Sequence, residues 1–121
     1  MLEIIPVGDH KVFFGHRRLS IVDLSPTGNQ PMASSCGRFE IIFNGEIYNH
    51  SELKDKLVGR DFRGTSDTET IVNYISEFGI ERVADFNGIF ALSVLDKQNK
   101  IMYLARDPFG VKPMYIYNKQ F

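Results

Sequence analysis

Asn44, Gly45 and Glu46 are residues that could carry chemistry, because they follow directly on an apolar run at residues 39–43. That run has the aromatic and β-branched composition of a strand, and an Asn-Gly pair ends it. Gly45 allows the backbone to turn, which would present the Asn44 side-chain amide and the Gly45 backbone N–H as donors. Such prepositioned donors form an oxyanion hole, where they stabilise negative charge developing on a carbonyl oxygen. The alternative for this Asn-Gly pair is an ordinary hairpin turn.

Three further segments favour the chemical interpretation. They are residues 15–23 (GHRRLSIVD), 65–69 (TSDTE) and 105–115 (ARDPFGVKPMY). Together with residues 44–50 (NGEIYNH), their order and spacing closely resemble the glutamine-hydrolysing domain of asparagine synthetases. That family is a class II glutamine amidotransferase with the N-terminal-nucleophile hydrolase fold. The resemblance extends from Gly15 to Tyr117 and implies a single domain over residues 1–121.

The resemblance implies a pocket for glutamine, which offers an α-carboxylate, an α-ammonium and a side-chain amide. Arg18 is expected to bind the carboxylate, since a planar guanidinium can pair with it through two hydrogen bonds. Taken alone, Arg18 would be read as a surface arginine at the end of a strand. By the same resemblance, the backbone that follows it lines the substrate site, at Leu19, Ser20, Ile21 and Val22.

Glu46 and Asp67 are expected near the ammonium group of the substrate. Asp67 also fits a purely structural role, because a carboxylate in the first turn of a helix is stabilised by the helix dipole. Ser66 and Glu69 have the spacing of a capping box, so Glu69 is assigned to the helix end and not to the substrate. The predicted site therefore consists of Arg18, Asn44, Gly45, Glu46 and Asp67, with Asn44 and Gly45 as the oxyanion hole.

The start of the chain departs from the family pattern. Domains of this family begin with a nucleophilic cysteine, and an Arg-Gly-Pro-Asp segment follows some tens of residues later, whereas this chain opens at Met1 and reaches the His-Arg-Arg-Leu segment within 20 residues. The expectation is a family domain without its first strand and its nucleophile. It should bind glutamine without turnover, because the remaining groups only assist a covalent attack that the missing cysteine would make. Its unpaired strand edge should make it marginally stable or lead to a homo-oligomer.

Cys36 is the single cysteine, and it lies mid-chain without the free α-amine that serves as the base in this family. It is therefore expected to be a loop or packing residue. One cysteine also excludes an internal disulfide and a cysteine-based zinc site. The histidines His10, His16 and His50 lack metal-ligand spacing. Asp107 is expected to tie a local turn.

The elements that must position these residues alternate between strand and helix patterns. Strands are expected at residues 11–14, 19–22, 39–43, 88–95, 100–105 and 114–117, and helices at 51–58, 66–78 and 80–85. This order predicts an α+β fold with helices packed on largely antiparallel sheet. With the resemblance, the expectation is a truncated αββα N-terminal-nucleophile hydrolase sandwich.

Composition limits the classes of partner. The chain has 121 residues, a hydrophobic fraction of 43%, a charged fraction of 24% and a net charge of −1. These values suit one globular core and give no basic surface for nucleic acid. No apolar run approaches the roughly 20 residues that span a bilayer, and no signal peptide is evident, so we expect a cytoplasmic protein.

The resemblance implies hydrolysis of L-glutamine to glutamate and ammonia. Ammonia would pass to a synthetase domain, C-terminal or separate, which uses ATP and Mg²⁺ to form asparagine; no cofactor is expected in this domain. Relatives that act on sugar phosphates usually have His-Thr-Arg-Trp where this chain has His-Arg-Arg-Leu, which favours the asparagine branch. The alternative is a non-catalytic glutamine-binding or interaction module derived from the same domain.

Overall fold

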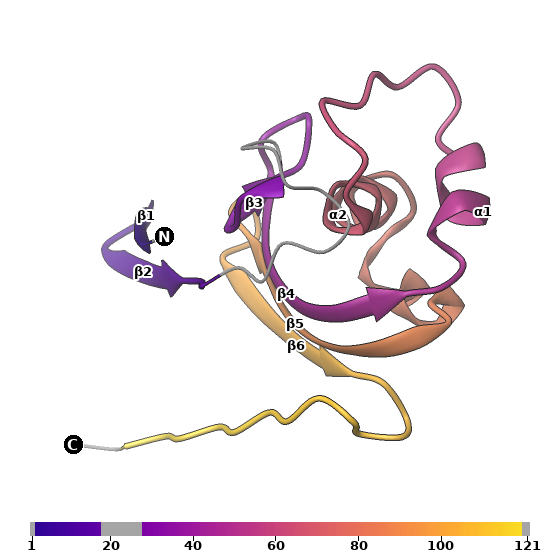
Figure 1. Ribbon diagram of the computed structural model, residues 1–121. Helices are drawn as coiled ribbons and strands as arrows, with labels where there is room; N and C mark the ends of the chain where they lie inside the picture. The colour runs from indigo at the N-terminus through magenta and orange to yellow at the C-terminus, as the bar shows by residue number, and fades with distance from the viewer. Residues whose placement is uncertain (1, 18–27, 120–121) are drawn as a thin grey trace.

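The computed structural model describes residues 2–17 and 28–119. Within these residues the strands form two groups, and the larger is a four-stranded antiparallel sheet in the order β3-β4-β5-β6 (Figure 1). Its strands are β3 (Met32–Ala33), β4 (Phe39–Ile47), β5 (Gly88–Asp96) and β6 (Ile101–Arg106). The smaller group is the hairpin of β1 (Leu2–Val7) and β2 (His10–Gly15). The helices are α1 (His50–Asp55), α2 (Asp67–Phe78) and the 3₁₀ helix η2 (Ile80–Asp85).

The helices cover one face of the curved sheet, with α2 lying across it (Figure 1). The main core forms between them. In α2, the buried Ile71, Tyr74 and Ile75 recur at helical spacing, so that they share one face of the helix. They pack with the inward residues of β4 and β5, which alternate along each strand as a pleated sheet requires. The sheet and α2 therefore pack around one shared core.

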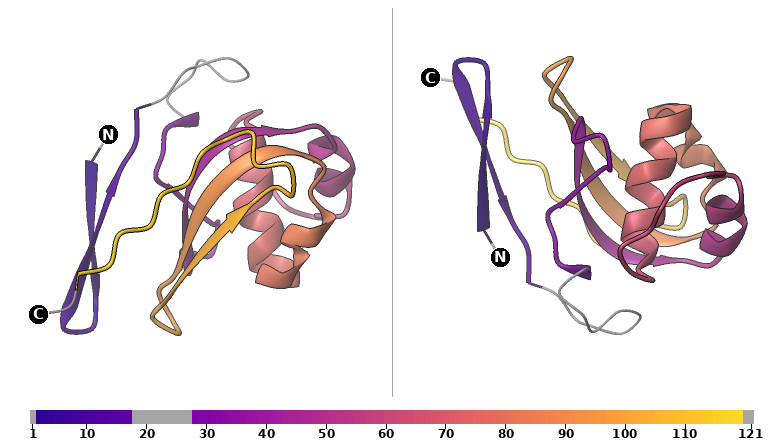
Figure 2. Two further views of the ribbon diagram at one scale, coloured as in Figure 1. Left: turned by 90° about the horizontal axis from the view of Figure 1, so that it is seen from below. Right: turned by 90° about the horizontal axis from the view of Figure 1, so that it is seen from above.

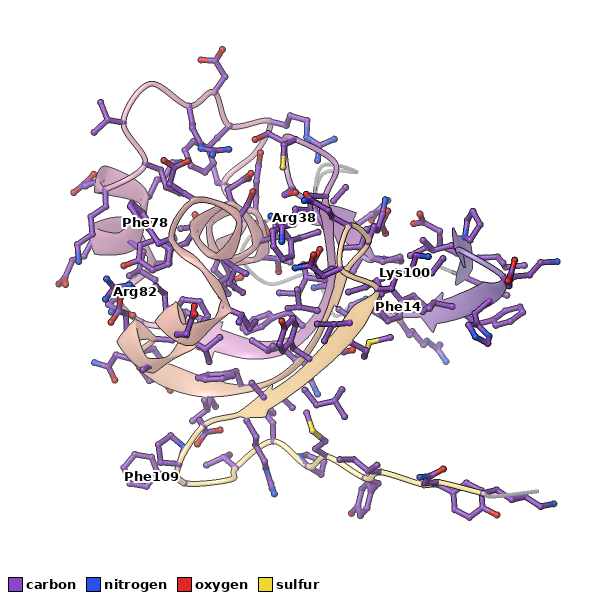
Figure 3. All side chains as sticks on the ribbon, turned by 180° about the vertical axis from the view of Figure 1, so that it is seen from behind. Phe14, Arg38, Phe78, Arg82, Lys100 and Phe109 are labelled. Carbon is purple, nitrogen blue, oxygen red and sulfur yellow. The ribbon has the colours of Figure 1, made fainter. Side chains whose placement is uncertain are left out.

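The β1–β2 hairpin lies apart from the sheet, and the extended segment after β6 runs beneath the face away from α2 (Figure 1 and Figure 2). A second, smaller cluster joins the hairpin to the sheet. Ile5, Val7 and Phe14 pack there with Leu95 of β5; Figure 3 labels Phe14 on β2. The rest of that outer face carries exposed apolar side chains, including Met102 and Leu104.

The α+β class predicted from the sequence is confirmed, and so are the capped helix from Ser66 and the β5–β6 hairpin. Two predicted boundaries and one predicted strand are wrong. The strand predicted at 39–43 continues to Ile47, and the helix predicted at 51–58 ends at Asp55. The strand predicted at 114–117 does not form, because Tyr115, Ile116 and Tyr117 are exposed and unpaired with any described strand. The strand predicted at 19–22 lies outside the described residues.

Asp107 fastens the turn after β6 to the centre of the sheet. Its carboxylate accepts hydrogen bonds from the backbone N–H groups of Phe90 (2.9 Å), Phe109 (2.9 Å) and Gly110 (3.0 Å). These bonds hold the pKa of Asp107 below its ordinary value, the Phe90 bond contributing most. The turn-forming role predicted for Asp107 is therefore correct, and the residue reaches further, into β5. Phe109 projects from the tip of this turn (Figure 3).

Candidate functional site

Asn44, Gly45 and Glu46 lie inside β4 and not in a turn, so the hairpin-turn interpretation of the Asn-Gly pair is wrong, and so is the backbone turn that we expected at Gly45. Gly45 pairs with Phe90 in the β4–β5 ladder. It has φ +142°, and a Cβ there would lie 2.0 Å from the backbone oxygen of Ile89. Glycine is required because the two strands approach too closely for any side chain.

A second glycine makes the same approach from β5. A Cβ on Gly88 would lie 2.1 Å from the backbone oxygen of Glu46. The two glycines are thus reciprocal, each leaving room for the backbone of the opposite strand. This close pairing holds the segment from Asn44 to Ile47 in extended conformation, although the Asn44-Gly45 pair is a sequence that favours a turn.

The hydrogen-bond pattern of β4 determines where the Gly45 N–H points. In an antiparallel strand, successive residues direct their N–H and C=O groups to opposite edges. Phe90, the partner of Gly45, exchanges hydrogen bonds with Asp107 on the β6 side, so the Gly45–Phe90 pair is not hydrogen-bonded. The Gly45 N–H is therefore directed away from β5, toward the edge of β4 that β3 covers only as far as Ile41.

The same edge carries the N–H groups of Phe43 and Ile47, and side chains occupy both. The Phe43 N–H donates to Gln30 Oε1 at 2.6 Å, and the Ile47 N–H donates to Asp67 Oδ2 at 3.1 Å. The Gly45 N–H lies between them, beyond the end of β3. An edge N–H flanked by two fixed acceptors is a suitable donor for an incoming carbonyl or oxyanion.

Asp67 is buried, at 7% exposure, yet it belongs to the first turn of α2 and reaches across to β4. Burial raises its pKa above the ordinary value, and the nearby Glu46 carboxylate adds to this. The Ile47 N–H, His50 and the backbone of Thr68 act in the opposite direction. A buried carboxylate with an acidic neighbour is an environment that favours a bound cation.

The polar residues around Asp67 make different hydrogen bonds at the start of α2. The Ser66 hydroxyl accepts from the Glu69 N–H at 3.3 Å, which confirms the Ser66 half of the predicted capping box. The Glu69 carboxylate, also buried, accepts from the backbone N–H groups of Arg63 (2.7 Å) and Gly64 (2.9 Å). Glu69 therefore anchors the preceding loop, and Asp67 is left to face β4.

Asn44 and Glu46 are exposed, on the face of β4 away from α2, while the alternating Phe43 and Ile47 are buried. Their side chains and Asp67 therefore approach the end of β4 from different sides of the sheet. Arg18, Leu19, Ser20, Ile21 and Val22 lie outside the described residues. Of the predicted site residues, the structure places Asp67 at the same edge of β4 as the Gly45 N–H, whereas the side chains of Asn44 and Glu46 project from the other face of the strand.

Cys36 is remote from this site, as expected. Its thiol lies 3.2 Å from the Ser76 hydroxyl, near the far end of α2. Ser76 is nine residues beyond Asp67, about 13 Å along a helix that rises about 1.5 Å per residue. Hydrogen bonds with Ser34 and Ser76 lower the pKa of the Cys36 thiol to about 7.

Sequence reasoning missed two residues that shape the site. Gln30 lies in the loop before β3, yet it is 6% exposed and bonded to β4. Asn49 anchors the turn after β4: its amide donates to the Asp85 carbonyl and accepts from the Asn87 N–H, both at 2.9 Å. Asn49 could have been identified from its place in the segment 44–50. For Gln30, the sequence offers only a polar residue beside Pro31.

Other features of the described residues lie elsewhere or are absent. A pocket of about 210 Å³ is lined by residues that include Glu3, Glu40 and Arg63, and neither Asp67 nor any residue of 44–46 lines it. The described histidine, cysteine and acidic residues form no group of three or more that could hold a metal ion. Within the same residues, no helix has the length and hydropathy to cross a bilayer.

Known proteins resemble this chain over most of its length. Residues 6–121 match the glutamine amidotransferase domain family. The chain is 45% identical to asparagine synthetase [glutamine-hydrolyzing] 2 of Bacillus subtilis (strain 168), over 88% of this chain and 14% of the relative. It is 42% identical to asparagine synthetase [glutamine-hydrolyzing] 3 of the same organism, over 93% of this chain and 19% of the relative. It is also 36% identical to the amidase chry2 of Gibberella zeae, over 88% of this chain and 16% of the relative. The chain thus spans less than a fifth of the length of these relatives.

Proposed function

This chain belongs to the glutamine amidotransferase domain family and resembles the domain of that family in asparagine synthetases. We propose that it binds L-glutamine at the end of β4. The observation that carries the proposal is the β4 edge. There the Gly45 N–H lies between the N–H groups that Gln30 and Asp67 occupy. This arrangement supports a site that receives a carbonyl oxygen and, one residue pair further on, a cation.

Each handle of glutamine has a counterpart in this proposal. Asp67, with Glu46 nearby, receives the α-ammonium group, since a cation offsets the cost of two neighbouring carboxylates. The Gly45 N–H and the Asn44 amide receive the side-chain carbonyl oxygen. Arg18 receives the α-carboxylate, and the backbone at Leu19, Ser20, Ile21 and Val22 completes the pocket; these five assignments rest on the family resemblance.

The proposed reaction is hydrolysis of the glutamine amide. A thiolate attacks the amide carbonyl carbon, and the Asn44 and Gly45 donors stabilise the oxyanion of the tetrahedral intermediate. Collapse of this intermediate releases ammonia and leaves a thioester, which water hydrolyses to glutamate. Cys36 contacts Ser76, about 13 Å beyond Asp67 along α2, and does not serve, so we assign the thiolate to an N-terminal cysteine of the family type.

We assign the ammonia to a synthetase domain, because the relatives are named glutamine-hydrolysing asparagine synthetases. In such an enzyme ATP and Mg²⁺ act in the synthetase domain, and the residues described here need only deliver ammonia. This part of the proposal concerns a longer protein, because the relatives extend far beyond the matched segment.

Titration calorimetry tests the pocket directly. The 121-residue chain should bind L-glutamine with a dissociation constant between about 1 μM and 1 mM, equal to about 8 to 4 kcal/mol. Arg18→Ala should weaken binding at least about tenfold, since it removes a charge-assisted hydrogen bond. The matched control is Arg17→Ala, which removes the neighbouring exposed arginine and should leave affinity unchanged. Equal losses in both variants would show that general positive charge is being measured.

Non-catalytic glutamine binding is the alternative to hydrolysis, and Cys36 lies away from the proposed pocket in either case. Glutamate release separates the two. We expect no release by this chain alone, and release on addition of a synthetic N-terminal segment that begins with cysteine. Activity of the chain by itself, retained in Cys36→Ser, would contradict the requirement for that thiol. Binding without any turnover, even with the added segment, would favour the non-catalytic role.

A further inference from the structure

Gln30 makes two hydrogen bonds that join separate parts of the candidate site. Its Oε1 accepts from the Phe43 N–H at 2.6 Å, and its Nε2 donates to Thr68 Oγ1 at 3.2 Å. The amide orientation follows from the first bond, because a backbone N–H needs an acceptor opposite it. Gln30 is 6% exposed and Thr68 is 3% exposed, so both groups depend on each other for hydrogen bonds.

These bonds complete a closed frame around the Gly45 N–H. On one side of Gly45, Phe43 is bonded to Gln30; on the other side, Ile47 is bonded to Asp67. Gln30 reaches Thr68, the neighbour of Asp67 in the first turn of α2. The start of α2 is thus attached to the β4 edge at two points, two residues to either side of Gly45.

We propose that Gln30 is a positioning residue that sets the distance between the Gly45 N–H and the Asp67 carboxylate. The proposal rests on the proposed function, in which one ligand uses both groups at once. A ligand that spans the two groups needs their separation to be fixed. A ligand that uses the carboxylate alone does not, because its contacts move with α2.

Thr68→Val tests this with a side chain of nearly the same shape. It removes the hydroxyl that accepts from Gln30 and keeps the bond between Gln30 and the Phe43 N–H. L-Glutamine affinity should fall about tenfold, the loss expected when one hydrogen bond that orients the site is broken. L-Norvaline has an α-amino acid head and an aliphatic chain without the amide, so its affinity should change less than about twofold. Thr68→Ser keeps the hydroxyl and should restore the ratio of the two affinities.

The main readout is the ratio of the two affinities, measured by calorimetry. The NMR chemical shift of the Gly45 amide proton in the ligand-free chain is a second readout, which reports whether the surroundings of this N–H have changed. A merely structural role of Thr68 would lower the unfolding temperature without changing that ratio. Equal losses for both amino acids, or no loss for either, would overturn the positioning role while leaving the proposed function intact. If the unaltered chain binds no L-glutamine, the proposed function fails and this inference with it.

Discussion

Asp67→Asn should bind L-glutamine about 10- to 100-fold more weakly than the unaltered chain, yet unfold at an equal or higher urea concentration. The loss reflects a charge-assisted contact to an ammonium group, worth about 1.5–3 kcal/mol. The fold should tolerate the change because the asparagine oxygen can still accept from the Ile47 N–H. Removing a buried charge also removes its desolvation cost.

The stability difference should depend on pH in a defined direction. Burial raises the folded-state pKa of Asp67, so its ionisation opposes folding as the pH rises through that value. The unfolded chain has an ordinary aspartate pKa of about 3.9, below which both states are protonated. The advantage of Asp67→Asn should therefore be greatest at neutral pH and vanish below about pH 3.9. Urea unfolding at pH 7 and pH 3.5 measures both limits.

Asp61→Asn is the matched control, since Asp61 is an exposed aspartate in the loop before α2. It should change neither glutamine affinity nor the urea midpoint. If Asp67→Asn instead destabilises the chain and keeps full affinity, Asp67 is only a helix-end residue. The dipole interpretation considered from the sequence would then be the better one.

Gly45→Ala should lower the free energy of unfolding by about 3 kcal/mol or more. The new Cβ would lie 2.0 Å from the Ile89 backbone oxygen and 2.7 Å from the Phe90 Cα, contacts that only a shift of the strand can relieve. Backbone strain at positive φ adds about 1–3 kcal/mol. For a domain with about 5–15 kcal/mol of stability, this is a large share of the total. The measurement is urea unfolding followed by circular dichroism.

Gly59→Ala provides the comparison that separates clash from strain. Gly59 also has a positive φ, +77°, but nothing lies within 4 Å of its added Cβ. It should cost about 1 kcal/mol, the strain alone. Similar costs at the two glycines would mean that β4 and β5 separate easily, and the close pairing would not be what positions the Gly45 N–H.

The sequence predicted best where a signal was local. Ser66 and the stripe that includes Ile71 and Ile75 predicted α2 correctly, because capping and helical periodicity involve residues three or four positions apart. The end of β4 was mispredicted because Asn-Gly is a turn signal that Gly88, more than 40 residues later, overrides by pairing. The strand at 114–117 has a suitable composition, but no described strand pairs with it.

The sequence could predict the candidate site only from the types of its residues, and not from the contacts between them. Asp67 lies in the first turn of α2, as the structural role weighed for it requires, and its carboxylate also reaches β4, while its role toward the substrate ammonium stays a prediction. Gln30 could not be recognised, because its partners lie 13 and 38 residues away and its neighbours have the composition of a loop. The edge position of the Gly45 N–H likewise depends on how Phe90 bonds to Asp107.

The anchoring of the loop before α2 by Glu69 has a practical consequence for engineering. That carboxylate holds the loop at Arg63 and Gly64, and Arg60 bonds to Glu77 at the other end of α2, so the exposed tip at Val58 and Gly59 lies outside both attachments. A short reporter peptide or a fluorescent label could be inserted at this tip without disturbing Asp67. The loop would then serve as an attachment handle, for example for immobilising the protein on a sensor surface.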